Sequence, residues 1–264
     1  MLEGKRVVVT GGGRDFGRAV SILMARHGAR VDLCARRLSS AEETSATIKQ
    51  NGGHARPHVC DMADPASIRA FAEVLLSDAT PIDILVLSAA QWLEGSLTDA
   101  SDEEIVSTVA SGLTGSILLT KALLPGLHSA NGADILVMGS ACALPGYVES
   151  NAHPAFYAAK HGIKGFCEIM SARLRADDIR VTGFYPPDFC TTDDAAGERT
   201  PDAAQGLLHS SSIWNAMQFV LAQPRNCLVE AINFRGATRA ELDDKGKERV
   251  ISSGELRKSL GLNG

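Results

Sequence analysis

Short apolar runs alternate along the chain with longer stretches in which apolar residues recur every three or four positions. The short runs are rich in Val, Ile and Leu, which is typical of strands that are buried on both faces of a sheet. The longer stretches have one apolar face and predict amphipathic helices. The predicted strands are residues 7–10, 30–35, 58–60, 83–88, 133–138, 179–185 and 228–233. The predicted helices are residues 16–27, 41–50, a segment that opens at 64–65, and residues 102–127, 155–176 and 213–222.

The regular alternation of strand and helix predicts the fold class. Parallel strands that are joined by right-handed helical crossovers form a sheet with helices on both faces. We therefore expect an α/β fold with a doubly wound parallel sheet of about seven strands. No Pro- or Gly-rich linker divides the chain, so we expect a single domain over residues 1–237 and a charged C-terminal tail at 238–264. The tail is expected to form a surface helix or a flexible end.

The composition narrows the class of protein. Apolar residues make up 45% of the chain, which allows a full core, and the net charge of −5 argues against a nucleic-acid surface. No long window is both apolar and uncharged, so we expect no membrane span. The six cysteines are scattered, as is usual for reduced thiols in a cytoplasmic protein. His54 and His58 lie close in sequence, but no cluster of ligands completes a metal site around them, and we expect none.

A glycine-rich turn lies between the first predicted strand and the first predicted helix. Residues 10–17 read Thr-Gly-Gly-Gly-Arg-Asp-Phe-Gly. Glycines let backbone amides approach a pyrophosphate, and the helix amino terminus adds partial positive charge. The turn predicts a Rossmann-type dinucleotide site, although a purely structural turn is the alternative. The candidate cofactor-binding residues in it are Gly11, Gly13, Arg14, Phe16 and Gly17.

Two arginines follow the second predicted strand and indicate which dinucleotide binds. Folds that prefer NAD place an acidic residue here to bond the ribose 2′-hydroxyl, whereas Arg accommodates a 2′-phosphate. Arg36 and Arg37 therefore favour NADP(H), and Arg14 in the turn adds to the positive charge. An ordinary solvated basic pair is the alternative interpretation.

A second motif lies at the start of the predicted helix 155–176. Residues 153–162 read His-Pro-Ala-Phe-Tyr-Ala-Ala-Lys-His-Gly. This stretch resembles the active-site helix of the short-chain dehydrogenase/reductase family, in which Tyr-x-x-x-Lys is followed by x-Gly. Aligning Lys160 and Gly162 with that pattern places the family's catalytic tyrosine on Phe156. The glycine turn is similar to the same family's Thr-Gly-x-x-x-Gly-x-Gly, and the resemblance covers about residues 4–236.

The resemblance implies roles for further residues of this chain. Ser140, directly after the fifth predicted strand, would hydrogen-bond the substrate carbonyl, and Lys160 would hold the nicotinamide ribose. A serine that only caps a turn and a lysine on the surface are the plain alternatives. Residues 188–212 would form a lid over the substrate. The cofactor contacts that the resemblance implies are Asp61 and Met62 near the adenine, Ala89 along the cofactor's path, Lys160, and Thr191 over the nicotinamide amide.

Several positions depart from the family's pattern. Asp15 replaces the middle glycine of the turn, and Leu87 begins a stretch where the family has Asn-Asn-Ala-Gly. Gly112 stands where the family often has an Asn that supports a proton-relay water, and Pro187 replaces a glycine after the sixth strand. The departures at Gly112 and Phe156 fall on the same proton pathway, whereas the side of the site that carries hydride is largely intact.

The proton donor is the open question, because a phenyl ring cannot replace a phenol. Tyr157 is a candidate, but a shift of one residue turns a side chain by about 100° around a helix. The Lys-x-Gly context favours Phe156 as the equivalent of the family's tyrosine. Other possible acids on segments expected to rim the cleft are Tyr147, His153 and Tyr185. The catalytic candidates from the sequence are Ser140, Lys160 and Tyr157.

Three functions fit these residues. The first is an NADP(H)-dependent oxidoreductase that acts on a carbonyl or alcohol, or on a conjugated quinone or enone, with a non-standard proton donor. The second is an NADP(H)-binding sensor or silent subunit, and the third is an isomerase, dehydratase or cyclase on the same fold. The resemblance also implies a homodimer or homotetramer that assembles through the helices at 102–127 and 155–176. We expect a small-molecule substrate in every case but the second.

Overall fold

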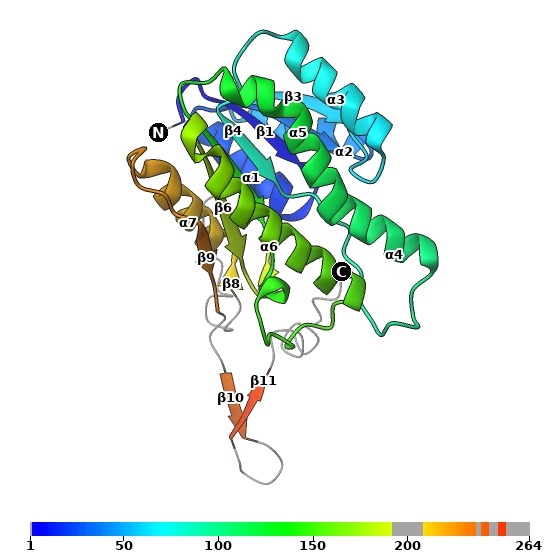
Figure 1. Cartoon of the computed structure of the whole chain (residues 1–264). Helices are drawn as coiled ribbons and strands as arrows, with labels where there is room; N and C mark the ends of the chain where they lie inside the picture. Colours follow the sequence, from blue (N-terminus) through cyan, green and yellow to red (C-terminus); the bar gives the residue numbers. More distant parts are fainter. Residues whose placement is uncertain (1, 192–207, 236–238, 243–247, 252–264) are drawn as a thin grey trace.

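A computed structural model of the 264-residue chain describes residues 2–191, 208–235, 239–242 and 248–251. Seven strands form its main sheet in the order β3-β2-β1-β4-β5-β6-β9 (Figure 1). Every neighbouring pair in this sheet is parallel. The strands are β1 (Arg6–Thr10), β2 (Arg30–Ala35), β3 (His54–Val59), β4 (Ile84–Leu87), β5 (Ala133–Met138), β6 (Ile179–Tyr185) and β9 (Ala231–Asn233). The predicted doubly wound parallel sheet is confirmed.

Helices cover both faces of the sheet, and each face has its own apolar core. One core joins the sheet to α1 (Asp15–Arg26), α2 (Leu38–Gln50) and α7 (Ser210–Ala222). The other joins it to α3 (Pro65–Ser77), α5 (Gly115–His128) and α6 (Pro154–Leu174). The helix α4 (Asp102–Val109) leads into α5 through a π-helical segment at Ala110–Thr114. Short 3-10 turns lie at Ala141–Ala143 and Arg175–Asp177.

Several elements differ from the sequence-based expectation. The seventh strand of the sheet begins at Ala231 rather than at residue 228, and the short parallel strands β7 (Phe189–Cys190) and β8 (Leu208–His209) lie within the expected lid. The strand β3 begins at His54 rather than at residue 58 and includes Pro57. It lies at the edge of the sheet, where one side of the strand forms no hydrogen bonds to another strand, so Pro is tolerated. Its polar side chains remain in contact with water. The C-terminal tail contains an antiparallel pair of strands, β10 (Arg239–Leu242) and β11 (Glu248–Ile251), so the expected surface helix is wrong for these residues. The alternating Arg-Ala-Glu-Leu of β10 already has the period of a strand.

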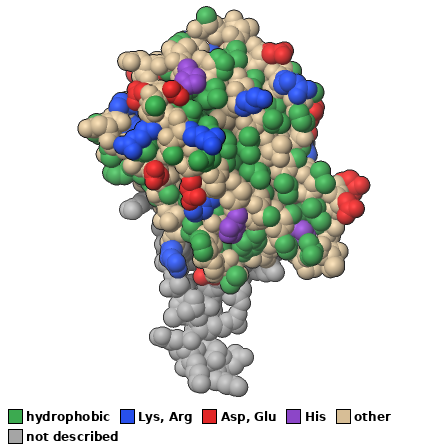
Figure 2. All heavy atoms as spheres, in the orientation of Figure 1, with side chains coloured by type: hydrophobic (Ala, Val, Ile, Leu, Met, Phe, Trp, Pro, Cys, Tyr) green, Lys and Arg blue, Asp and Glu red, His purple; other side chains and the backbone are tan. Residues whose placement is uncertain are grey.

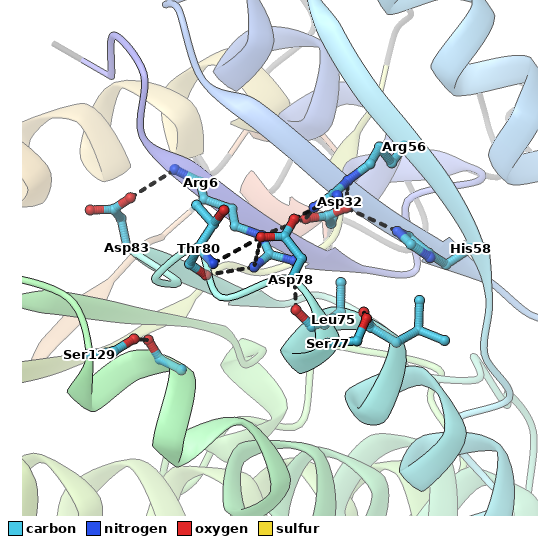
Figure 3. A network of polar contacts seen from close by, with 12 residues as sticks. Arg6, Asp32, Arg56, His58, Leu75, Ser77, Asp78, Thr80, Asp83 and Ser129 are labelled. Atoms are coloured by element: carbon cyan, nitrogen blue, oxygen red, sulfur yellow. Dashed lines mark hydrogen bonds and ion pairs between the residues drawn. The ribbon is translucent and has the colours of Figure 1, made fainter.

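A buried ionic network ties β1, β2 and β3 together (Figure 3). The Arg6 side chain, which is 2% exposed, donates from Nε to Asp32 Oδ2 at 2.9 Å. Its other nitrogens donate to the carbonyl oxygens of Leu75, at the end of α3, and of Thr80. Arg56 and His58 from β3 bind the same carboxylate. Although burial opposes ionisation, these hydrogen bonds hold the pKa of Asp32 well below its usual range.

The long helical segment Asp102–His128 is apolar enough, by length and composition alone, to cross a membrane. Its Leu119, Leu123 and Leu127 are 0% exposed and pack in the core beneath the sheet. Its hydropathy therefore reflects, in part, its place in the core. Other apolar side chains of this segment, such as Val106, face outward.

Candidate active site

The candidate site lies at the carboxyl edge of the sheet, where the chain order reverses between β1 and β4. Loops that leave neighbouring strands in opposite directions open a crevice at such a switch point. The Thr10 hydroxyl, at the end of β1, accepts the amide hydrogens of Ser88 and Ala89 at 2.9 and 3.0 Å. These bonds fix the glycine turn after β1 against the loop after β4. The turn predicted to hold the cofactor is therefore at the expected edge.

Close backbone approaches shape the glycine turn. Gly11 has a φ of +68°, and a Cβ there would lie 3.1 Å from the Ala89 Cα. A Cβ on Gly13 would lie 2.9 Å from that of Ala35 at the end of β2, and one on Gly17 would lie 2.2 Å from the Gly11 carbonyl oxygen. Side chains at these positions would collide with the loop after β4, the end of β2 and the turn itself, so glycine is what lets the turn pack this closely.

Asp15 occupies the position of the missing glycine with a glycine-like backbone. Its φ is +48°, in the left-handed region that glycine favours and that Asp enters more readily than most residues. Its carboxylate lies 3.4 Å from Arg14 Nε, and both side chains are largely exposed. The departure at this position is therefore compatible with the turn, and Arg14 offsets part of its charge.

The two arginines after β2 stand beside this turn. Arg36 and Arg37 are exposed, and Arg37 donates to Ser40 Oγ at 3.3 Å. The Gly12 amide donates to the Cys34 carbonyl at 2.8 Å, which brings the end of β2 against the turn. The structure thus places both arginines at the rim of the candidate cofactor site.

The predicted adenine contacts lie on the loop after β3. The Asp61 side chain accepts the amide hydrogen of Ala63 at 2.9 Å, so the carboxylate shapes its own loop. Met62 is buried, and its carbonyl oxygen lies where a Cβ on Gly115 would fall. Asp61 is half-buried and remains partly accessible.

Lys160 is buried beside the end of β5. Its Nζ donates to the Met138 carbonyl at 2.9 Å and lies 5.2 Å from the centre of the Phe156 ring. Burial lowers the pKa of Lys160 to about 8. The plain alternative of a surface lysine is wrong for this residue, because its side chain is enclosed. Phe156 and Lys160 share one face of α6, as the four-residue spacing predicts.

The Phe156 ring is packed as an apolar side chain. It is 7% exposed and meets Trp92 edge-on, with ring centres 4.9 Å apart. Cys142 and Ala152 complete the same small cluster. Phe156 thus presents an apolar wall beside Lys160, where it can offer no proton.

Ser140 begins the loop after β5. Its Oγ accepts the amide hydrogen of Cys142 at 3.1 Å and so caps the turn Ala141–Ala143. Accepting this bond uses a lone pair of the hydroxyl rather than its proton, so the cap and a role toward a substrate carbonyl are compatible. Ser140 and Lys160 both lie near the end of β5, since Lys160 bonds the carbonyl of Met138, two positions before Ser140.

The four candidate acids have different surroundings in the structure. The Tyr157 hydroxyl donates to the Ser150 carbonyl at 3.3 Å, and burial raises its pKa to about 12. Tyr185 is enclosed in the sheet, where Cβ atoms on Gly139 and Gly183 would strike its ring. His153 is fully buried and caps α6 by accepting the Ala155 amide hydrogen at 3.0 Å. Tyr147 packs against the Phe156 cluster.

Two further features bear on the site. The π-helical segment Ala110–Thr114 brings Gly112 between two walls of the site, because a Cβ there would lie 3.6 Å from that of Ala159 and 3.7 Å from that of Ala90. The sequence did not predict this irregularity, although a glycine inside a long helix is a signal for one. Thr191 is half-buried at the end of the described segment, and most of the predicted lid, residues 192–207, lies outside the described residues.

Comparisons with known proteins agree with this geometry. The family model of short chain dehydrogenases matches residues 5–202. The chain is 31% identical to D-threitol dehydrogenase of Mycolicibacterium smegmatis, over 70% of each chain. It is also 31% identical to the human 3-oxoacyl-[acyl-carrier-protein] reductase, over 72% of this chain and 77% of that protein. Among solved structures, it is similar to a metagenomic short-chain oxidoreductase in complex with NADP, with a TM-score of 0.74, 25% identity, and 89% and 98% of the two chains covered.

The protein therefore belongs to the short-chain dehydrogenase family, as the motif resemblance predicts. Its relatives above are oxidoreductases, and its fold is theirs.

Proposed function

We propose that the protein is an NADP(H)-dependent oxidoreductase that uses a proton donor other than the family's tyrosine. Its substrate would be a carbonyl or alcohol, or a conjugated quinone or enone. The observation that supports this most is the enclosed Lys160, which is bonded to the Met138 carbonyl next to Ser140. A lysine is rarely buried without a function, because its charge is unfavourable there.

The residues around the glycine turn fit an NADP(H) molecule. The backbone amides of the glycine turn at Gly11 and Gly13 would take the pyrophosphate, and Arg36 with Arg37 would take the 2′-phosphate. Lys160 would hold the nicotinamide ribose, with Asp61 and Met62 near the adenine, Ala89 along the cofactor's path and Thr191 over the nicotinamide amide. When bound, the cofactor supplies or accepts hydride. The solved relative that binds NADP supports this assignment.

The substrate class follows from what the chain's own residues can do. The Ser140 hydroxyl would donate a hydrogen bond to the carbonyl oxygen, and the Lys160 ammonium would add positive charge nearby. Phe156 contributes an apolar wall and no proton. A quinone or enone spreads its own negative charge, so it would need less help from a proton donor than a simple ketone.

Cofactor preference is the direct test. Titrating the purified protein with NADPH and with NADH, followed by nucleotide fluorescence, should show tighter binding of NADPH. The double variant Arg36→Ala/Arg37→Ala should lose about tenfold or more in NADPH affinity and little in NADH affinity, since bonds to a charged group contribute about 1.5–3 kcal/mol. Arg69→Ala, which removes an exposed arginine from α3, is the matched control. Equal affinities of the unmodified protein for both nucleotides would refute the role of the arginine pair.

The alternative is a protein that binds NADP(H) without redox turnover, as a sensor, a silent subunit, or an isomerase, dehydratase or cyclase. The packed Phe156 ring favours it, because the usual hydroxyl is missing beside Lys160. Phe156→Tyr separates the two functions. If a broad panel of carbonyl compounds produces no NADPH oxidation before or after this change, the alternative is the better account.

We also propose that the protein acts in the cytoplasm as a symmetric homodimer or homotetramer, without a metal, nucleic acid or membrane as partner. Hydrophobic side chains are spread over the face that α4, α5 and α6 present (Figure 2). Val106, Ile117 and Ile169 on these helices are 66%, 37% and 46% exposed. Exposed apolar groups of this kind are typical of a surface that another subunit covers.

A further inference from the structure

We infer that Tyr147 supplies the proton that Phe156 cannot, an inference that rests on the proposed oxidoreductase function. The Tyr147 hydroxyl is buried and has no hydrogen-bond partner within the part of the chain that the structure describes. Buried hydroxyl groups are nearly always paired, and leaving one unpaired is unfavourable. A substrate carbonyl oxygen is the kind of acceptor that this hydroxyl lacks.

Tyr147 lies on the loop that joins β5 to α6, between Ser140 and Phe156 in the sequence. It follows the turn Ala141–Ala143 and packs against the small apolar cluster that contains Cys142, Ala152 and Phe156. Burial, and then the nearby Asp188 carboxylate beyond the end of β6, raise the pKa of the Tyr147 phenol. The phenol therefore lies among the loops after β5 and β6 and the start of α6, and it keeps its proton at neutral pH.

The other candidate donors are bonded elsewhere or fully enclosed. The chain has three tyrosines. Tyr157 donates a hydrogen bond to the Ser150 carbonyl at 3.3 Å, and the Tyr185 hydroxyl lies against Cys167 inside the sheet–α6 interface. His153 caps α6 through Nδ1, and its Nε2 also has no partner within the described residues, but its side chain is 0% exposed, whereas Tyr147 is partly exposed. Tyr147 is the tyrosine whose hydroxyl remains available for a ligand.

The proposed step balances in atoms and charge. With hydride supplied to the carbonyl carbon by a bound NADPH, the π pair of the C=O bond would move to oxygen. The Tyr147 O–H bond breaks and a new O–H bond forms on the substrate, which leaves a phenolate. That phenolate takes a proton from water, so the net change is one hydride and one proton added to the carbonyl.

Kinetics of matched variants test the assignment. Cyclohexanone, 2-cyclohexenone and menadione serve as substrates with NADPH. Tyr147→Phe should reduce turnover by about 10²- to 10⁴-fold, the usual effect of losing a general acid. NADPH affinity should stay the same, and Phe156→Tyr placed in the Tyr147→Phe background should restore turnover. Tyr185→Phe removes a phenol hydroxyl outside the cleft and should keep most of the activity.

Two readouts do not depend on turnover. Because the Tyr147 hydroxyl has no partner, Tyr147→Phe should melt at the same temperature as the unmodified protein or higher, whereas Tyr157→Phe gives up a hydrogen bond. In protein labelled with ¹³C at the tyrosine ζ-carbon, 2-cyclohexenone with NADP⁺ should shift the resonance that Tyr147→Phe removes and leave the Tyr185 resonance in place.

The outcomes separate this inference from the proposed function. If the unmodified protein turns over and Tyr147→Phe is equally active, or if Tyr157→Phe alone loses activity, the inference fails and the oxidoreductase stands. If only Phe156→Tyr turns over, the fold can transfer hydride but Tyr147 is no donor. If neither protein oxidises NADPH with any substrate, the proposed function and the inference fail together. An unmoved Tyr147 resonance at saturating ligand also overturns the inference.

Discussion

At the scale of single residues, Lys160 is held in surroundings that oppose its own charge. Burial lowers its pKa to about 8 from 10.5. Between these values the unfolded chain binds more protons than the folded one, so folding stability rises with pH across that window. Below it the buried charge costs about 3 kcal/mol, since one pKa unit is 1.36 kcal/mol.

Lys160→Met should therefore be more stable than the unmodified protein at pH 7, while binding NADPH less tightly. The gain should shrink as the pH rises from about 8 and vanish above 10.5, where the lysine of both states has lost its proton. Urea unfolding of both proteins at pH 7 and at a pH above 10.5 measures this difference in the free energy of unfolding. A stability difference that does not change with pH would show that the charge of Lys160 is not what destabilises the fold.

The sequence predicted where the candidate residues lie in the fold better than how their side chains are oriented. Lys160, Ser140 and the glycine turn could be predicted because each follows a strand or lies on a helix whose position the apolar pattern already determines. The direction of the Tyr157 and Tyr147 hydroxyls could not, because loop packing around Ser150 and Cys142 determines it. The left-handed backbone of Asp15 is an intermediate case, since its place in the turn made a positive φ reasonable.

At the scale of elements, the glycine turn lies directly against α1 at Gly11 and Gly17. A Cβ on Gly17 would lie 2.2 Å from the Gly11 carbonyl oxygen, so Gly17→Ala must move the turn away from the helix. We expect a loss of about 1–3 kcal/mol in the free energy of unfolding, the usual effect of overpacking, and weaker NADPH binding.

Gly165→Ala is the matched control within α6, because no atom lies within 4 Å of a Cβ there. Alanine is favoured over glycine in helices by about 1 kcal/mol, so this variant should gain stability. Chemical denaturation and NADPH titration of both variants check the pair. Equal effects at the two positions would contradict the close approach in the turn.

The Asp32 network should control acid stability. Because the pKa of Asp32 is lowered, its carboxylate stabilises the fold above about pH 4, the ordinary pKa of an aspartate. This stabilisation is lost as the pH falls further. Asp32→Asn should lose about 3–5 kcal/mol at pH 7, because Arg6 stays buried without its partner. The difference from the unmodified protein should narrow at acidic pH, measured by unfolding at pH 7 and in acid. An unchanged gap would contradict the role of the charge.

At the scale of the whole molecule, the order of apolar runs was enough to predict the sheet. The strands β4 and β5 are buried along their whole length, and their sequences are apolar except for Asp134 in β5. The sequence predicted that the edge strand β3 begins at residue 58 rather than at His54, because much of this strand is exposed to water and has no continuous apolar run. The β10–β11 pair was not predicted, because the tail is rich in charged residues and its apolar pattern is weak.

Assembly is the property of the whole molecule that the surface helices should decide. If α4, α5 and α6 form the subunit interface, a charge at Ile169 would be buried without a partner, so Ile169→Glu should shift the protein toward monomer. Phe219→Glu changes a 55% exposed residue on α7, which covers the opposite face of the sheet, and should leave the assembly intact. Sedimentation velocity measures the mass of each variant.

The melting temperature of the unmodified protein should also rise with concentration, because association stabilises the folded state by mass action. An unmodified protein that sediments as a monomer, or two variants that sediment alike, would exclude this face as the interface.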